Sequence, residues 1–207
     1  MALINIPTTG LWGTIAGWIN TNFITLETSV RHIGWSDNIA FFSAAKGKGT
    51  SEPTWEDIGN GQYAYSFLAG DELFVHHHIN HDYRLGTDAY PHVHFLVDQT
   101  MNAGEQITWR YAYVIAKGHA QGQSLTAAET IIDMTYTATG AEVAGEHIVL
   151  ECSDVQAFDL IEPDTIVMAR VDLLSENVTG KIFGLVADLH YQVDGITTVN
   201  KAPNFYI

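Results

Sequence analysis

Histidine is the residue type in this sequence whose number and spacing point most directly to chemistry. The chain holds ten histidines, and six of them fall between residues 76 and 94. A neutral imidazole is a common metal ligand, and histidine changes charge near neutral pH. His92 and His94 are two residues apart, so on a strand their side chains lie on one face. They are the first candidates for a metal site, and His190 with a carboxylate would complete the set of ligands.

Two later segments repeat this placement of polar residues two positions apart. Arg170 and Asp172 share one face of an expected strand, and Asp188 and His190 share one face of another. Opposite the second pair we expect one apolar face made of Phe183, Leu185, Ala187, Leu189 and Tyr191.

Three interpretations of these polar residues remain open. The first is an exposed or interface-facing sheet surface whose polar side chains pair across strands. The second is a partly buried hydrogen-bond network in which Arg170, Asp172 and Asp188 orient the imidazoles. The third is a metal site built on His92 and His94.

The metal interpretation has one specific form. Gly86, His92, His94 and Asp98 resemble the first motif of the cupin superfamily, in which the last of these positions is normally Glu. The resemblance implies a metal ion held by these residues on a jelly-roll scaffold. The second cupin motif places a histidine after a turn that bears Gly and Pro, and the late candidate His190 follows no such turn.

Other catalytic patterns give no candidate residues. Cys152 has no cationic neighbour in sequence to lower its pKa, so a buried structural cysteine is expected. Glu162 and Asp164 flank Pro163, which is typical of a turn rather than of an acid/base pair. The sequence contains no Gly-x-Ser-x-Gly elbow and no Gly-rich phosphate loop with Lys. We therefore expect no catalytic residues, no cofactor beyond the metal considered above, and a protein that is not an enzyme.

The composition limits the partners of the chain. Its 207 residues carry 9 Lys and Arg against 24 Asp and Glu, a formal net charge of −15. Binding to a nucleic-acid backbone or to an anionic membrane needs clustered cations, so neither partner is expected. A single cysteine excludes an internal disulfide, and no apolar run approaches the ~18 residues that span a bilayer. The first ten residues lack a positive region and an apolar core, so no signal peptide is expected.

The elements that must position the histidines are expected to be strands. Alternation of apolar and polar residues dominates from about residue 39 onward, and Gly, Asn, Asp and Pro clusters separate the segments. This pattern predicts an all-β fold, an antiparallel β-sandwich of the jelly-roll type. Residues 118–129 form either a loop or a short helix. The eight expected strands cover residues 63–68, 73–79, 91–98, 106–116, 130–137, 147–152, 165–174 and 181–193.

The N-terminal segment follows a different pattern. Residues 1–35 are expected to form an extended arm and an amphipathic helix, and residues 36–207 the β-sandwich domain. The helix either covers the core of its own domain or anchors the chain to a partner. Its apolar face is expected to contain Trp12, Ile15, Ile19, Phe23, Leu26 and Val30.

Several short segments resemble a widespread group of tailed-bacteriophage virion structural proteins. The first runs from His81 to Phe95 and contains Gly-Thr and then Pro-His-Val-His-Phe. The others are residues 108–113 with Trp-x-x-x-Tyr, residues 164–171, and residues 187–195 with Asp-x-His-Tyr. Trp55-Glu-Asp-Ile occupies the place of the segment that opens those domains. The resemblance covers roughly residues 55–195 and implies a location in the virion.

Together the resemblance and the missing catalytic pattern predict a non-enzymatic virion structural protein. A capsid decoration (cement) or head-fibre role is expected, with a homotrimer bound to the major capsid protein or to head–tail components. The alternatives are a tail or collar component and a cupin-like metal-binding protein. A carbohydrate-binding module is a further alternative, because Tyr63, Tyr65 and Tyr90 are candidate surface aromatics.

Overall fold

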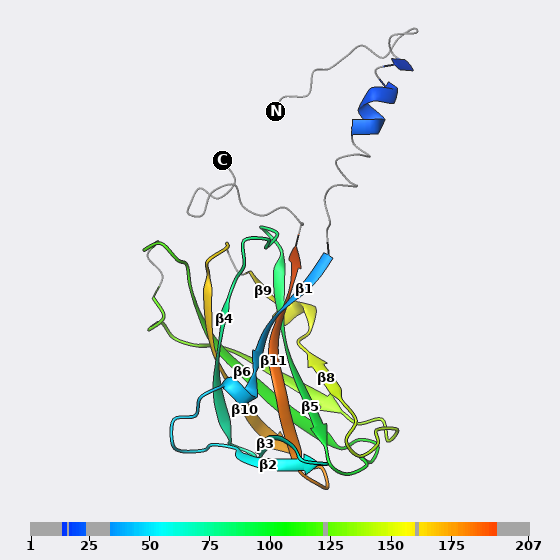
Figure 1. The fold of residues 1–207 in the computed structure, drawn as a ribbon, viewed down its shortest axis with the longest axis vertical. Coiled ribbons are helices and arrows are strands. Elements are labelled where there is room, and N and C mark those ends of the chain that lie inside the picture. The colour runs from blue at the N-terminus through cyan, green and yellow to red at the C-terminus, as the bar shows by residue number, and fades with distance from the viewer. Residues whose placement is uncertain (1–13, 16, 24–33, 122–123, 160–161, 194–207) are drawn as a thin grey trace.

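Strands dominate the computed structural model, which describes residues 14–15, 17–23, 34–121, 124–159 and 162–193. They form two antiparallel sheets that pack face to face (Figure 1). The elements in chain order are β1 (Gly34–Phe41), η1 (Phe42–Ala44), β2 (Thr54–Gly59), β3 (Gln62–Phe67), β4 (Glu72–His78), β5 (Asp88–Val97), β6 (Gln106–Ala116), β7 (Thr130–Thr137), β8 (Ile148–Glu151), η2 (Asp154–Gln156), β9 (Phe158–Asp159), β10 (Ile166–Glu176) and β11 (Ile182–Val193).

The strand order is that of a jelly roll. One sheet contains β1, β11, β5 and β8 in this spatial order, and the other contains β4, β10, β6 and β7. Among these eight strands, those that follow one another along the chain lie in opposite sheets, except for β6 and β7, which are neighbours, and the result is the paired Greek keys of this fold. The β2–β3 hairpin extends the first sheet by pairing with the beginning of β11, and β9 pairs with the beginning of β5. The expected fold class is confirmed.

The core lies between the two sheets and consists of the inward half of each alternating strand. Val93 and Phe95 of β5 face Trp109 and Tyr111 of β6 from the opposite sheet, and all four are buried. Side chains that alternate between the core and solvent are the usual pattern of a sandwich. The outward half of β5 and β11 is therefore free to carry polar groups, and His92 is one of them.

All eight strands expected from the sequence are present within three residues of their expected ends. β1, β2 and β9 are additional strands that the alternation analysis did not predict. β1 was not predicted because its inward residues are small or polar, whereas its large apolar residues Trp35, Ile39 and Phe41 face outward. Where residues 118–129 are described, they form turns and loop rather than a helix.

A β-bulge in β11 corrects one detail of the expected apolar face. The register between β11 and β5 shifts between Gly184 and Val186, so the residues on either side of the shift point in opposite directions. Ala187 lies in the main core, but Phe183 and Leu185 belong to a second small cluster with Ala64 of the β2–β3 hairpin. Assigning Phe183 and Leu185 to the same face as Ala187 was therefore wrong.

The N-terminal segment contains helix at residues 14–15 and 17–23. Ile15, Ile19 and Phe23 of the expected apolar face are all exposed there, and so is Trp18. The other expected members of that face, Trp12, Leu26 and Val30, lie outside the described residues. No helix in the described part of the chain is long and apolar enough to cross a membrane.

Candidate functional site

A row of histidines and carboxylates crosses the outward face of four neighbouring strands, β1, β11, β5 and β8. Strand register creates this row, because Asp188 and Glu151 are the residues paired with His92 on its two sides, and Asp37 is paired with His190. Its central histidine and aspartate are 96 residues apart in the chain. We call this row the histidine stripe; its members are Asp37, His92, His94, His147, Glu151, Asp188 and His190.

His92 occupies the centre of the histidine stripe. Its Nε2 lies 3.2 Å from Oδ2 of Asp188, within hydrogen-bond distance, and its Nδ1 lies 3.6 Å from Oε2 of Glu151. Only 5% of His92 is exposed, which is unusual for an outward-facing position on a sheet. The neighbouring polar side chains therefore cover the His92 ring.

His94 approaches the same carboxylate oxygen from the next outward position of β5. Its Nε2 lies 3.2 Å from Oδ2 of Asp188, and its Nδ1 lies 2.8 Å from Nε2 of His147 in the loop before β8. The His94 and His147 rings are stacked, with centroids 5.0 Å apart. Because two imidazole nitrogens 2.8 Å apart need one donor and one acceptor, this contact restricts the tautomers of both rings.

Asp188 is the buried acid of the histidine stripe, with 4% of its surface exposed. Burial raises the pKa of the Asp188 carboxyl, but the contacts from His92 and then His94 outweigh burial and hold the pKa below its ordinary value. Asp188 therefore stays ionised at neutral pH. A buried carboxylate requires hydrogen-bond donors or a cation beside it.

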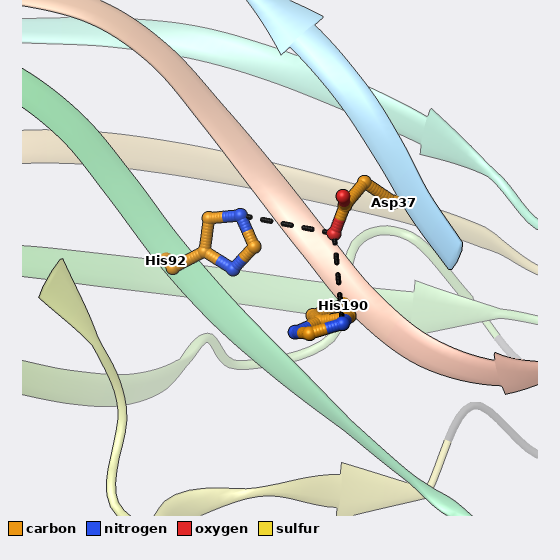
Figure 2. Close-up of side chains that lie close together, drawn as sticks. All are labelled: Asp37, His92 and His190. Atoms are coloured by element: carbon orange, nitrogen blue, oxygen red, sulfur yellow. Dashed lines mark ion pairs between the residues drawn. The ribbon is translucent and has the colours of Figure 1, made fainter. Parts of the chain in front are cut away.

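His190 and Asp37 form the more exposed end of the histidine stripe. Figure 2 shows Asp37 of β1 facing both His92 of β5 and His190 of β11. Oδ1 of Asp37 lies 3.9 Å from Nε2 of His92 and 4.0 Å from Nε2 of His190. Nδ1 of His190 lies 3.0 Å from Oε2 of Glu151, which links this end to the β8 side.

All three metal candidates named from the sequence lie in the histidine stripe, but His94 and His190 belong to different groups of ligand-type side chains. His92 belongs to two groups of ligand-type side chains, one with His94 and Asp188, and one with Asp37 and His190. In both groups, Nε2 of His92 faces the carboxylate. Sequence reasoning missed Asp37, because it lies on the unpredicted strand β1, and it also missed the loop residue His147.

The partly buried network exists, but it does not include Arg170 and Asp172. Both residues lie on β10 in the other sheet, where Arg170 pairs with Asp172, Glu72 and Glu129. Of the three residues expected to orient the imidazoles, only Asp188 does so. Strand alternation fixes the face of one sheet on which a side chain lies, but it does not say which sheet contains the strand.

The cupin-like spacing does not assemble a cupin-like ligand set here. Asp98, the carboxylate of that motif, accepts a hydrogen bond from the backbone N–H of Lys181 at 2.8 Å in the turn before β11. It belongs to neither of the two groups of ligand-type side chains found in the described residues. The carboxylate beside His92 and His94 is instead Asp188, from a strand far along the sequence.

A second histidine cluster surrounds Asp164 at the opposite sheet. Nε2 of His78, His81 and His119 lie 3.3, 3.1 and 2.7 Å from its carboxylate oxygens. Burial raises the pKa of Asp164, but hydrogen bonding from His119 and the contacts of His81 and His78 outweigh it and lower the pKa overall. Asp164 has φ of +61°, so the turn expected around Pro163 does form.

The remaining candidates from the sequence are placed as follows. Cys152 is buried, and burial raises the pKa of its thiol to about 12, with the nearby Glu151 and Asp154 carboxylates adding to the shift. Tyr63 is exposed on β3 and stacks against Trp55, whereas Tyr65 is partly buried and Tyr90 lies beside Trp35.

Comparison with known proteins gives matches to solved structures only. No protein-family model and no curated protein matches this sequence. Among solved structures, a carbohydrate-binding module specific for non-crystalline cellulose matches with 14% identity and a TM-score of 0.27, over 64% of this chain and 76% of the module. TmCBM61 in complex with β-1,4-galactotriose matches with 14% identity and a TM-score of 0.27, over 77% of this chain and 88% of that one.

A third structure, the Agl-KA catalytic domain, matches with 8% identity and a TM-score of 0.33. The match covers 98% of this chain but only 31% of that domain, so this chain spans about a third of its length. At these identities and TM-scores, we transfer no ligand and no activity to this chain.

Proposed function

We propose that this chain is a non-enzymatic structural protein of a bacteriophage virion, acting as a homotrimeric capsid decoration or head-fibre module. Its partners are the major capsid protein or head–tail components. The ordered sequence blocks between residues 55 and 195 support this assignment, and so does the jelly-roll topology, which viral capsid domains use. The buried Cys152, with its raised pKa, supports a role without nucleophilic chemistry.

The observation that carries the proposal is the outward apolar row of β1. Its exposed positions alternate with inward ones, and Trp35, Ile39 and Phe41 are 51%, 52% and 55% exposed. A strand that turns its large apolar side chains away from the core is typical of a surface that contacts another protein.

The free energies of burial and of association indicate that this row is part of a larger interface. Covering the exposed half of three large apolar side chains contributes roughly 3 kcal/mol, because complete burial of one contributes about 1.5–3 kcal/mol. Association costs at least about 4 kcal/mol in lost freedom of motion. Further contacts must therefore join the β1 row, and the exposed helix residues Trp18 and Phe23 are available for them.

The test has two parts, location in the particle and assembly through β1. Mass spectrometry of purified virions should detect the protein, and labelled antibody in electron microscopy should place it on the capsid. Light scattering should give the mass of a trimer. Ile39→Asp should yield a folded monomer that does not join the particle, because it places a charge in the apolar row.

Val155→Asp is the matched control, since Val155 is 93% exposed in η2, outside the β1 row. This variant should remain trimeric and join the particle. Absence of the protein from virions would overturn the proposal, and label on the tail or collar would replace the capsid role with the alternative one. Normal assembly of Ile39→Asp would remove β1 from the interface.

A second candidate function, glycan binding, rests on the aromatic pair of the β2–β3 hairpin. Trp55 and Tyr63 are both exposed, and their rings are stacked with centroids 6.2 Å apart. Flat exposed rings stack against the apolar faces of sugars. A glycan array with the wild type and Trp55→Ala tests this function: binding that Trp55→Ala abolishes supports it, and an array without binding excludes it for the glycans displayed.

A further inference from the structure

We propose that the buried end of the histidine stripe is a binding site for one divalent transition-metal ion, with Nε2 of His92, Nε2 of His94 and Oδ2 of Asp188 as ligands. Two imidazoles and one carboxylate form a ligand set suited to Zn²⁺ and similar ions. The site adjoins the β1 apolar row, because Ile39 of that row is paired with Asp188, but its three ligands are not members of the row and the inference does not use the proposed virion role.

The distances between the ligand atoms support the metal site. Both imidazole Nε2 atoms lie 3.2 Å from the same Oδ2 of Asp188. Ligands about 2.0–2.1 Å from a tetrahedral zinc ion are separated from one another by ~3.3 Å. The two nitrogen–oxygen separations therefore match the edges of a zinc tetrahedron without a change of backbone.

Unsatisfied polar atoms show that protein groups alone do not complete this cluster. Nε2 of His94 and Oδ1 of Asp188 are buried without a hydrogen-bond partner, although both side chains lie in contact with polar neighbours. Buried polar atoms in proteins are usually paired, and an unpaired one costs free energy. An ion between the rings and the carboxylate would accept the free lone pair of His94.

The outer nitrogen of His94 has a partner of the kind that metal-bound histidines use, whereas Nδ1 of His92 has no hydrogen-bond partner among the described residues. A histidine that binds metal through Nε2 usually donates Nδ1–H to a neighbouring acceptor, which fixes the tautomer. Nδ1 of His94 lies 2.8 Å from Nε2 of His147, and Nδ1 of His92 faces the Glu151 carboxylate at 3.6 Å. When the ion is bound, a proton on Nδ1 of each ring would leave the Nε2 lone pair free to face the ion beside Oδ2 of Asp188.

The alternative group at the exposed end fits an ion less well. Oδ1 of Asp37 is 3.9 Å from Nε2 of His92 and 4.0 Å from Nε2 of His190, wider than the ~3.3 Å edge of a zinc tetrahedron. The Asp37 side chain is also about half exposed, whereas that of Asp188 is buried. His92 uses Nε2 toward both carboxylates, so the two groups compete for one ion, and the buried group is favoured.

Zinc titration of the full-length chain tests the site. After treatment with a chelator and without an affinity tag, the wild type should bind one Zn²⁺ per chain in competition with a chromogenic chelator. Co²⁺ should give the intense visible absorption of a four-coordinate ion. Zn²⁺ should raise the melting temperature, because the ion joins the neighbouring strands β5 and β11.

The variants separate this site from other histidines. His94→Ala and Asp188→Asn should each weaken zinc binding by about 100-fold or more, and the outer-contact variant His147→Ala by about 10- to 100-fold. His76→Ala is the matched control and should leave the affinity unchanged, because His76 is exposed and lies outside the stripe, whereas His190→Ala removes a ligand of the competing group and should weaken binding less than His94→Ala. His147 is exposed, so His147→Ala keeps the test valid if Asp188→Asn does not fold.

Three results would overturn the proposal. The first is a wild type that binds zinc no more tightly than the His92→Ala/His94→Ala double variant. The second is loss of binding in His190→Ala with normal binding in His94→Ala, which would place the ion in the exposed group. The third is a ratio of several ions per chain that is equally reduced by His76→Ala, an exposed histidine outside the stripe, because that would indicate surface binding only.

Discussion

His77 shows how one buried side chain links the fold to pH. It is the inward histidine of the run on β4, and its Nδ1 lies 3.0 Å from the backbone oxygen of Asn38 on β1. Burial lowers the pKa of His77 from 6.5 to about 4, although the Asn38 hydrogen bond opposes the shift. The ring is therefore neutral at pH 7, and its Nδ1–H donates to Asn38.

The lowered pKa of His77 predicts that the folded chain loses stability in acid. Between pH 6.5 and about 4, the unfolded chain binds a proton at His77 that the folded chain does not. The stability from neutral His77 is thus complete above pH 6.5 and is lost as the pH falls toward 4, by roughly 3 kcal/mol at most. Urea unfolding of His77→Gln across this range should show a weaker pH dependence than that of the wild type.

The control for this prediction is His76→Gln, because His76 is the exposed neighbour on the same strand. It should keep the pH dependence of the wild type. An equal pH dependence in His77→Gln and the wild type would contradict the assignment to His77.

The candidate metal ligands could be predicted from the sequence only in part. His92 and His94 were recognisable because two residues separate them on a strand, and His190 because it follows Asp188 at the same spacing. Register was not predictable, and register selects Asp188 rather than Arg170 or Asp172 as the partner of His92. Register depends on pairing between distant segments, which no local pattern encodes.

At the level of elements, β11 has a glycine packed against core side chains beside its bulge. A Cβ atom on Gly184 would lie 2.7 Å from ring atoms of Phe42 and Phe67. Gly184→Ala should therefore lower the free energy of unfolding by about 1–3 kcal/mol through overpacking. Denaturant unfolding measures this change.

Gly34→Ala is the matched control, because a Cβ atom on Gly34 in β1 meets nothing within 4 Å. Its effect should stay within about 0.5 kcal/mol, as for most surface substitutions. Equal effects of the two substitutions would show that loss of chain flexibility, rather than crowding at Phe42 and Phe67, determines the result.

The strands were predictable wherever the large apolar side chains of a strand faced inward. β5, β6 and β10 alternate in this way, and their expected limits were nearly correct. β1 reverses the pattern, and the two residues of β9 are too few to show one. The sequence also contains a pattern that predicts β2. Asn60-Gly61, both with positive φ, forms the two-residue turn typical of a β-hairpin.

The N-terminal helix gives a further prediction at this scale. β1 begins at Gly34, and Trp35 contacts Tyr90 and His190, so a truncation should start at residue 34 rather than 36. Residues 34–207 should melt cooperatively and remain soluble, yet fail to join virions, if residues 1–31 attach the sandwich to its partner.

Differential scanning calorimetry and mass spectrometry of particles check the truncated chain. Precipitation or loss of a cooperative transition would assign the helix to the core of its own domain. Incorporation of residues 34–207 into virions at the level of the full chain would show that the helix is dispensable for attachment.

For the whole molecule, net charge should oppose association of the proposed trimer. Each chain carries −15, so three chains carry 3 × −15 = −45 and repel one another. Raising the salt concentration from about 0.01 M to about 0.1 M shortens the screening length from about 30 to about 10 Å. Sedimentation at these two concentrations should therefore show more trimer at the higher one. More dissociation at higher salt would indicate an interface held by charge pairs instead.

The beginning of β1 and the end of β11 lie side by side at one end of the sandwich (Figure 1). Gly34 is paired directly with Val193, so their Cα atoms are separated by only about 5 Å. A linker of a few residues could therefore join these two positions, and new termini could be opened at the Asn60-Gly61 turn at the opposite end of β11. Such a circular permutant of residues 34–193 would keep every strand pairing of both sheets while moving the free ends of the polypeptide to the other pole of the jelly roll.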